Sequence, residues 1–522
     1  MTIGLQCLVL SFVLLSPLGG VLINGQDGNA GKPQAAASKN AEGIPKERPF
    51  ELVSLIASVQ WLPPEFAADL LIGVAESARV TESDWKKELL EQAFRITADC
   101  EFQMPQKAVG PYPVDTRAGY LGAAFRLKLD GLSLRCRIVE SMLRFDKAKA
   151  LQLFTEIGKL KFPPVSCDRG LVYEVSDFYI TAAKLFRDAF SVKEKQAGEH
   201  IRFLESLIDD VSSPVQIAPA ANTVRSLEMS REQRQTLVTA FASQIAKLSG
   251  DDRLFSSSIY SVDNEIGRLL HTCNEQGVYS IELIRSLRSY YIKQFSASRC
   301  SDTLRNTGDT GALPAEVTSF NNRVRTLTDN NNVLEIEAKD VKPSRIDGKV
   351  DVHFYWESPR ALDLMERFKR LRFGSGRNPL TAAEMDTVQW RADFNEFFKA
   401  LLAWDKNDEA SVEDYFHQKC NLFEGLMNIP LRTPERDEVI RKFSSFLWQL
   451  DLKSVNRIEW FWHAKNLLPR DFSKDSGDRS ADLRTILQSS NNLVLYAYAE
   501  VWKTLSTAQK PQPPNGQSHR KP

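Results

Sequence analysis

The sequence lacks the short motifs that mark the common catalytic and cofactor-binding sites. It contains no G-x-S-x-G nucleophile elbow, no H-E-x-x-H zinc motif, no G-x-G-x-x-G dinucleotide fingerprint and no G-x-x-x-x-G-K-[ST] phosphate loop. Histidine is also scarce, with six residues in a chain of 522. The sequence therefore predicts no cofactor and assigns no enzyme class, and a non-enzymatic role is favoured.

An excess of either charge is absent as well. The 67 lysine and arginine residues balance the 67 aspartate and glutamate residues. Affinity for nucleic acid depends on neutralising phosphates, so a chain without net positive charge is not expected to have a nucleic-acid partner. The composition, with 43% hydrophobic and 26% charged residues, is typical of a globular protein.

No charged side chain follows Met1 until Asp27, and the residues between are largely apolar over 3–23. Helix breakers and a short polar stretch then follow, which predicts a signal peptide over 1–25 and a secreted or periplasmic protein. The usual basic residues at the start are missing, so an uncleaved N-terminal anchor is the alternative, and the only membrane contact expected.

Cysteine pairs with C-x-x-C spacing are absent, and so is any Asn-x-Ser/Thr acceptor for glycosylation. The missing acceptor favours a bacterial source. Outside the predicted signal peptide six cysteines remain, which permits disulfides in an exported protein, with buried free thiols as the alternative. These cysteines are Cys100, Cys136, Cys167, Cys273, Cys300 and Cys420.

What the sequence has is a long series of amphipathic helix signals. Apolar residues recur every three or four positions, and start signals such as Asp146, Ser358–Pro359 and the Thr381/Glu384 capping box precede them. These patterns predict an all-α fold of stacked antiparallel helix pairs, either α-solenoid-like or a multi-helix bundle. Alternation at period two predicts at most a short β-hairpin near 333–356. Helices are expected at 63–78, 81–96, 120–129, 132–145, 146–160, 171–190, 194–211, 231–248, 262–274, 281–295, 360–371, 382–404, 412–427, 434–450, 458–467 and 481–505.

Composition also divides the chain. After the signal peptide, polar residues predict a disordered linker over 26–47, and prolines predict a disordered tail over 506–522. Glycine and asparagine interrupt the helical series over 301–350. We therefore expect an N-terminal helical domain over 48–300 and a C-terminal helical domain over 351–505.

Two helical segments carry weak candidates for chemistry. His417 and Cys420, with Glu413 one turn earlier, can share one helix face as metal ligation requires. The set is incomplete, so no metal is expected, and chelation should leave the melting temperature unchanged. Glu459 and His463, one helical turn apart, could form a general base, although a packed aromatic core with a hydrogen-bonded histidine at its edge is favoured.

A basic, glycine-rich turn follows the expected helix at 360–371. Its backbone could form a concave anion site, whereas a helix C-cap with basic residues near the helix dipole explains the same pattern. We call it the glycine turn, and it consists of Arg372, Gly374, Ser375, Gly376 and Arg377.

Two functions remain open. Helix pairs stacked in series build an extended surface, which favours an interaction or scaffold protein that binds a protein or peptide. The alternative is an all-helical carbohydrate-active enzyme with paired carboxylates in a cleft, for which the abundance of helices, acidic residues and tryptophans is the basis.

Overall fold

The computed structural model describes residues 48–59, 61–107, 116–163, 171–250, 252, 254–297, 299–300, 313–327, 334–342, 346–348, 353–409, 411–449, 455–467 and 493–506. Apart from Arg48, these residues belong to one compact unit, Pro49–Pro522. The predicted signal peptide, the linker over 26–47 and all of the predicted tail except Ser506 lie outside the described residues.

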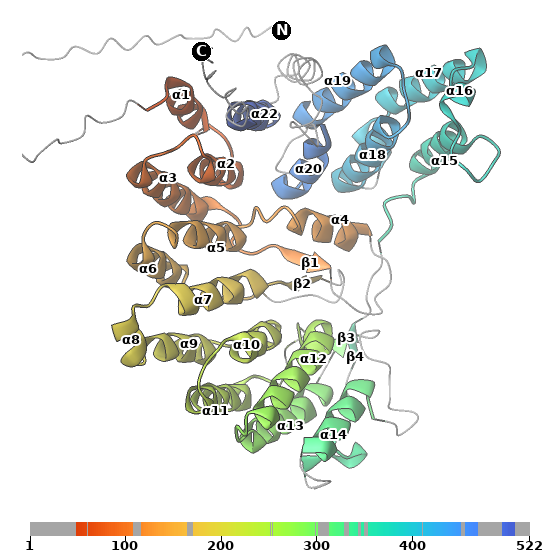
Figure 1. The fold of residues 1–522 in the computed structure, drawn as a ribbon. Helices are drawn as coiled ribbons and strands as arrows, with labels where there is room; N and C mark the ends of the chain where they lie inside the picture. Colours follow the sequence, from red (N-terminus) through yellow and green to blue (C-terminus); the bar gives the residue numbers. More distant parts are fainter. Residues whose placement is uncertain are drawn as a thin grey trace, which may run out of the picture. The chain divides into compact units, whose positions relative to one another are not determined.

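The fold is all-α, as predicted (Figure 1). Most helices of the first part start within a few residues of the expected positions because apolar stripes and capping residues set them. Their bounds are α1 Phe50–Val59, α2 Pro64–Glu76, α3 Ser83–Ile96, α4 Thr116–Phe125, α5 Gly131–Met142, α6 Lys147–Ile157, α7 Ser176–Asp188, α8 Val192–Gln196, α9 Glu199–Asp209, α10 Pro214–Ser226, α11 Arg231–Lys247, α12 Leu254–Glu275, α13 Ile281–Phe295 and α14 Ala315–Leu327.

The later helices follow the same rule. Ser358 accepts a hydrogen bond from the Ala361 backbone, and Thr381 forms the predicted capping box with Glu384. Their bounds are α15 Pro359–Phe373, α16 Ala382–Met385, α17 Val388–Ala403, α18 Val412–Met427, α19 Thr433–Gln449, α20 Arg457–Ala464 and α22 Leu493–Ser506. The last of these begins inside the expected helix at 481–505, whose earlier residues are not described, and ends one residue beyond it.

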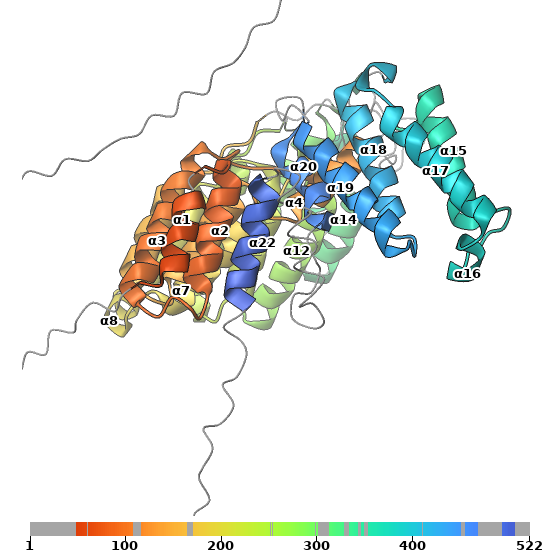
Figure 2. The same cartoon turned by 90° about the horizontal axis from the view of Figure 1, so that it is seen from above.

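Successive helices pack as adjacent pairs. Helix α2 packs on α3, α5 on α6 and α7, α9 on α11, α10 on α12, and α11 on α13. Each helix thereby buries the apolar stripe that it could not hide alone. Figure 2 shows α15 beside α17, and these two helices also pack on each other.

One expected helix differs from the structure at its start. Leu171–Tyr173 forms strand β2, which pairs antiparallel with β1, Pro105–Lys107, and α7 begins only at Ser176. The run over 171–190 starts with the short apolar stretch Leu171–Tyr173, and periodicity cannot separate a strand from a helix over so few residues.

The expected helix at 194–211 is interrupted. Gly198 has a φ of +76°, which ends α8 and starts α9. A residue in this left-handed conformation breaks the α-helix because it turns the chain out of the right-handed path.

The segment predicted as a hairpin is also different in its described part. Ala338–Asp340 forms a short 3-10 helix, and strand β4, Ile346–Gly348, pairs in parallel with β3, Arg299–Cys300. An alternating pattern indicates an extended chain but not its partner, which here is Arg299–Cys300, a segment far earlier in the chain.

Contacts also connect the first and last helices of the unit. Helix α22 packs on α1 and α2, and α20 packs on α4. The described cysteines Cys100, Cys136, Cys273 and Cys420 are free thiols, whereas the side chains of Cys167 and Cys300 are not described. Among the described helices, none combines the length and the apolar character that a membrane crossing needs.

Candidate functional sites

Two capped helices bring together a cluster of titratable side chains that could hold a metal ion. The Ser411 side chain accepts a hydrogen bond from the Asp414 backbone and starts α18. The Asn456 side chain accepts from the backbone amides of Ile458 and Glu459 and starts α20. These caps fix where the first turns of the two helices begin, and hence where their acidic side chains lie.

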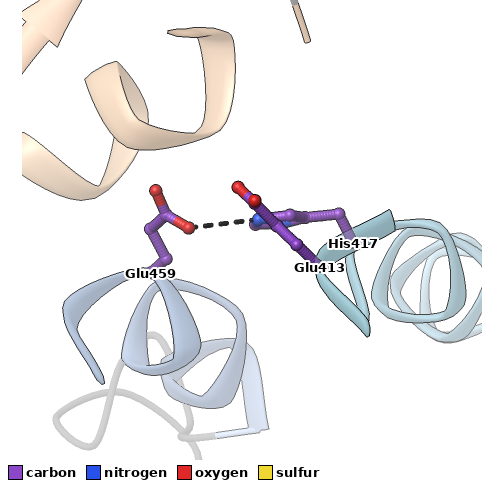
Figure 3. A group of neighbouring side chains, drawn as sticks. All are labelled: Glu413, His417 and Glu459. Atoms are coloured by element: carbon purple, nitrogen blue, oxygen red, sulfur yellow. Dashed lines mark hydrogen bonds and ion pairs between the residues drawn. The ribbon is translucent and has the colours of Figure 1, made fainter. Parts of the chain in front are cut away.

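The cluster centres on His417 (Figure 3). Glu413 and His417 lie one turn apart on α18, and Glu459 reaches them from α20. The Nε2 atom of His417 lies 3.2 Å from Oε2 of Glu459. One ligand atom from each of these three residues falls within 4.8 Å of the other two. We call Glu413, His417 and Glu459 the His417 cluster.

The other side of the His417 ring joins a second histidine. Nδ1 of His417 lies 3.2 Å from Nε2 of His463. Nδ1 of His463 lies 2.7 Å from Oε1 of Glu424, which also accepts a hydrogen bond of 2.8 Å from the Asn466 amide. A continuous hydrogen-bonded chain therefore runs from Glu459 through both imidazoles to Glu424.

Aromatic rings enclose the imidazole of His417. The Tyr120 ring from α4 stacks on it with centroids 4.2 Å apart, and Tyr355 lies at 4.7 Å. Both His417 and His463 have no exposed surface. This burial lowers the pKa of His417 well below its usual value, with the neighbouring His463 adding to the effect, so the ring is neutral near pH 7.

Of the three metal-ligand candidates from the sequence, the structure brings two together and leaves the third apart. His417 and Glu413 come together as expected, but Cys420 is not among the groupings of possible metal ligands within the described residues. Burial raises the pKa of the Cys420 thiol well above its usual value, so it remains a protonated, fully buried side chain.

Glu459 and His463 also differ from the expected pair. Glu459 contacts His417, and His463 contacts His417 and Glu424. His463 is hydrogen-bonded within an aromatic core, which was the favoured interpretation. Sequence reasoning missed Glu424, and only its position seven residues after His417 on the same helix could have indicated it.

A second polar pair lies beside the cluster. Nε2 of His353 lies 2.6 Å from Oδ1 of Asp414, and the Tyr355 hydroxyl donates to Oε1 of Glu413 over 3.3 Å. Sequence reasoning did not single out His353 or Tyr355, because they precede α15 in a segment without helical periodicity. They show that the segment before α15 returns to the start of α18.

The glycine turn has the geometry of a helix C-cap. Gly374 has a φ of +58°, and its amide donates to the Arg370 carbonyl over 2.7 Å. The Gly376 amide donates to the Phe373 carbonyl, and the Arg372 guanidinium lies over the Phe373 ring. These two glycine amides are thus engaged inside the turn, and anion binding there stays a prediction. The exposed members of the turn are Gly374, Ser375, Gly376 and Arg377.

A cavity of about 390 Å³ lies between α15 and α17. It has an apolar floor, where the Trp390 indole donates to the Leu371 carbonyl over 2.9 Å, and a rim of both charges. The floor and rim residues are Leu371, Trp390, Phe397, Asp363, Arg367, Arg370, Asp393 and Glu396.

The charged side chains at the rim differ in whether they already form ion pairs or hydrogen bonds. Arg367 contacts Asp363 at 3.0 Å and Glu396 at 3.2 Å, and Asp393 accepts from the Gln389 amide. The Arg370 guanidinium is exposed and makes no ion pair or side-chain hydrogen bond with the described residues. The cation that this cavity offers to a ligand is therefore Arg370.

Comparison with known proteins adds no relative. The chain matches no protein-family model, no curated protein and no solved structure.

Proposed function

We propose that this chain is a non-enzymatic interaction protein that binds a peptide segment of a partner in the cavity between α15 and α17. The observation that carries the proposal is the apolar floor under a rim with one unengaged cation. A volume of about 390 Å³ falls in the range of ligand pockets and suits a peptide side chain better than a large cofactor.

The charged side chains at the rim indicate which kind of peptide would bind. Asp363 and Glu396 already share Arg367, so the group left to recognise a ligand is Arg370. A peptide with an apolar residue beside an acidic one would place its side chain on the floor at Trp390 and its carboxylate at Arg370. The helix pairs that precede the cavity support the proposal, because such series commonly present peptide-binding surfaces.

Selection from a library of displayed random peptides tests this. Peptides enriched on the immobilised full chain should share an apolar residue next to Asp or Glu. Their affinity, followed by fluorescence anisotropy, should fall about tenfold in Arg370→Glu, since attraction becomes repulsion. Arg436→Glu, at an exposed arginine on α19 outside the cavity, is the matched control and should bind as the wild type does. Equal binding by the wild type and Arg370→Glu would refute the proposal.

Catalysis by paired carboxylates is the second candidate. Its support is the convergence of Glu413 and Glu459, but they meet at a buried imidazole rather than across an open cleft. Release of reducing sugars from polysaccharides by the wild type, lost in Glu459→Gln, would favour this candidate over peptide binding.

A further inference from the structure

The spacing within the His417 cluster is close to that of a coordination sphere. Zinc bonds to nitrogen and oxygen are about 2.0–2.2 Å long, which places neighbouring ligand atoms roughly 3.0–3.5 Å apart. Nε2 of His417 and Oε2 of Glu459 lie 3.2 Å apart, and the Glu413 oxygen lies within 4.8 Å of both. A small movement of the Glu413 side chain, which is only half-buried, would complete a three-ligand set.

The side chains behind His417 fix which ring nitrogen faces this spot. Nδ1 of His417 lies 3.2 Å from Nε2 of His463, whose Nδ1 lies 2.7 Å from Oε1 of Glu424. Nε2 of His417 is therefore the nitrogen that faces Glu459, at 3.2 Å.

We propose that Glu413, His417 and Glu459 bind one divalent transition-metal ion of the zinc class. An imidazole nitrogen and two carboxylate groups are ligands that zinc-class ions take, and one ion placed between them would contact all three. The imidazole favours zinc-like ions over Ca²⁺ and Mg²⁺, which take oxygen ligands. This site is independent of the peptide cavity and goes beyond peptide binding.

The neighbouring residues hold the ligands in position. Metal-bound histidines usually form a hydrogen bond through their second nitrogen, and here that nitrogen contacts His463, which in turn contacts Glu424. Tyr120 stacks on the His417 ring, and Tyr355 donates to Glu413. Three protein ligands leave a position for water or a ligand atom, as in metal sites that are not purely structural. The expectation that no metal binds rested on residues of one helix, and Glu459 from α20 was missing from it.

Calorimetric titration tests the site on the full chain after treatment with EDTA and removal of the chelator. One Zn²⁺ should bind per chain, more tightly than Ca²⁺ or Mg²⁺, and Co²⁺ should give visible absorption bands of a bound ion. Glu459→Gln keeps the shape of the side chain and removes its charge, and it should bind Zn²⁺ at least about 100-fold more weakly. Asp414→Asn is the matched control. Asp414 is another buried acid on α18, it contacts a different histidine, His353, and its variant should bind Zn²⁺ as the wild type does.

Thermal melting separates loss of the site from loss of the fold. Zn²⁺ should raise the melting temperature of the wild type and of Asp414→Asn but not that of Glu459→Gln. If Glu459→Gln melts cooperatively yet binds Zn²⁺ as the wild type does, the assigned ligands are wrong. Absence of stoichiometric Zn²⁺ binding overturns the site, and a preference for Ca²⁺ or Mg²⁺ overturns the metal class. Because peptide binding depends on Arg370, neither result bears on that proposal.

Discussion

His417 combines complete burial with a position between two other titratable side chains. Its neutral ring is held by Nδ1 contact to His463 and by the stacked Tyr120 ring. The unfolded chain exposes the same imidazole to water, where it takes up a proton near its ordinary pKa. The protonation of this one residue therefore differs between the folded and unfolded states.

The pH dependence of stability should reflect that difference. The folded-state pKa of His417 lies well below 6.5, so below pH 6.5 the unfolded state binds a proton that the folded state does not. The free energy of unfolding contributed by this group is therefore present above pH 6.5 and is lost as the pH falls. Urea unfolding in EDTA at pH 7.5 and 5.5 should show a smaller pH effect for His417→Gln than for the wild type. The same pH effect in both proteins would contradict this account.

Asp130 is a second residue whose environment makes a prediction. Its buried carboxylate caps α5 by accepting from the Ser133 amide at 3.0 Å and from the Ser133 hydroxyl. Burial raises its pKa to about 6, although these hydrogen bonds act in the opposite direction. Asp130→Ala removes the cap and should lower the free energy of unfolding by about 1–2 kcal/mol. Asp188→Ala, at an exposed helical position, should change it by less than about 0.5 kcal/mol. Equal losses would contradict a capping role.

At the scale of elements, helix starts could be predicted from sequence, but partners could not. Ser358 and Thr381 act as caps where the sequence placed them, because a cap depends on residues within one turn. Strand β2 was missed because its partner, β1, lies far earlier in the chain. The candidate site divides in the same way: Glu413 and His417 share a helix face, whereas Glu459 joins them only through the packing of separate helices.

The approach of α15 to α18 gives a test at this scale. A Cβ atom added to Gly425 on α18 would lie 2.4 Å from the Phe368 ring on α15, so the two helices are close because this residue has no side chain. Gly425→Ala should lower the free energy of unfolding by about 1–3 kcal/mol.

A matched glycine isolates the effect of packing from that of helix propensity. Gly73 lies inside α2, and an added Cβ would meet no atom within 4 Å. Gly73→Ala should therefore raise the free energy of unfolding by about 0.5–1 kcal/mol. Chemical denaturation of both variants measures this, and opposite signs are expected. Stabilisation by both substitutions would show that α15 and α18 are free to move apart.

At the scale of the whole molecule, the contacts qualify the predicted division into domains over 48–300 and 351–505. The described residues past Arg48 form one compact unit. Helix α22 packs on α1 and α2, and α20 packs on α4, so the last helices lie against the first. The Tyr498 hydroxyl donates to Asp69 over 2.7 Å, and Arg457 contacts Glu65 at 3.1 Å. These contacts cross the predicted boundary.

Limited proteolysis decides how far the two parts are separable. The glycine- and asparagine-rich composition of 303–349 still predicts that early cuts fall there. Because Phe66 packs on Trp460, Phe461 and Tyr498, the two fragments should stay together in size-exclusion chromatography under native conditions and separate only in denaturant. Elution of two separate folded fragments would instead support independent domains. Early cuts confined to the chain ends would mean that 303–349 is packed against the helices and that no boundary lies there. If the fragments remain associated, the burial of His417 beneath Tyr120 requires both of them, since α4 comes from one fragment and α18 from the other.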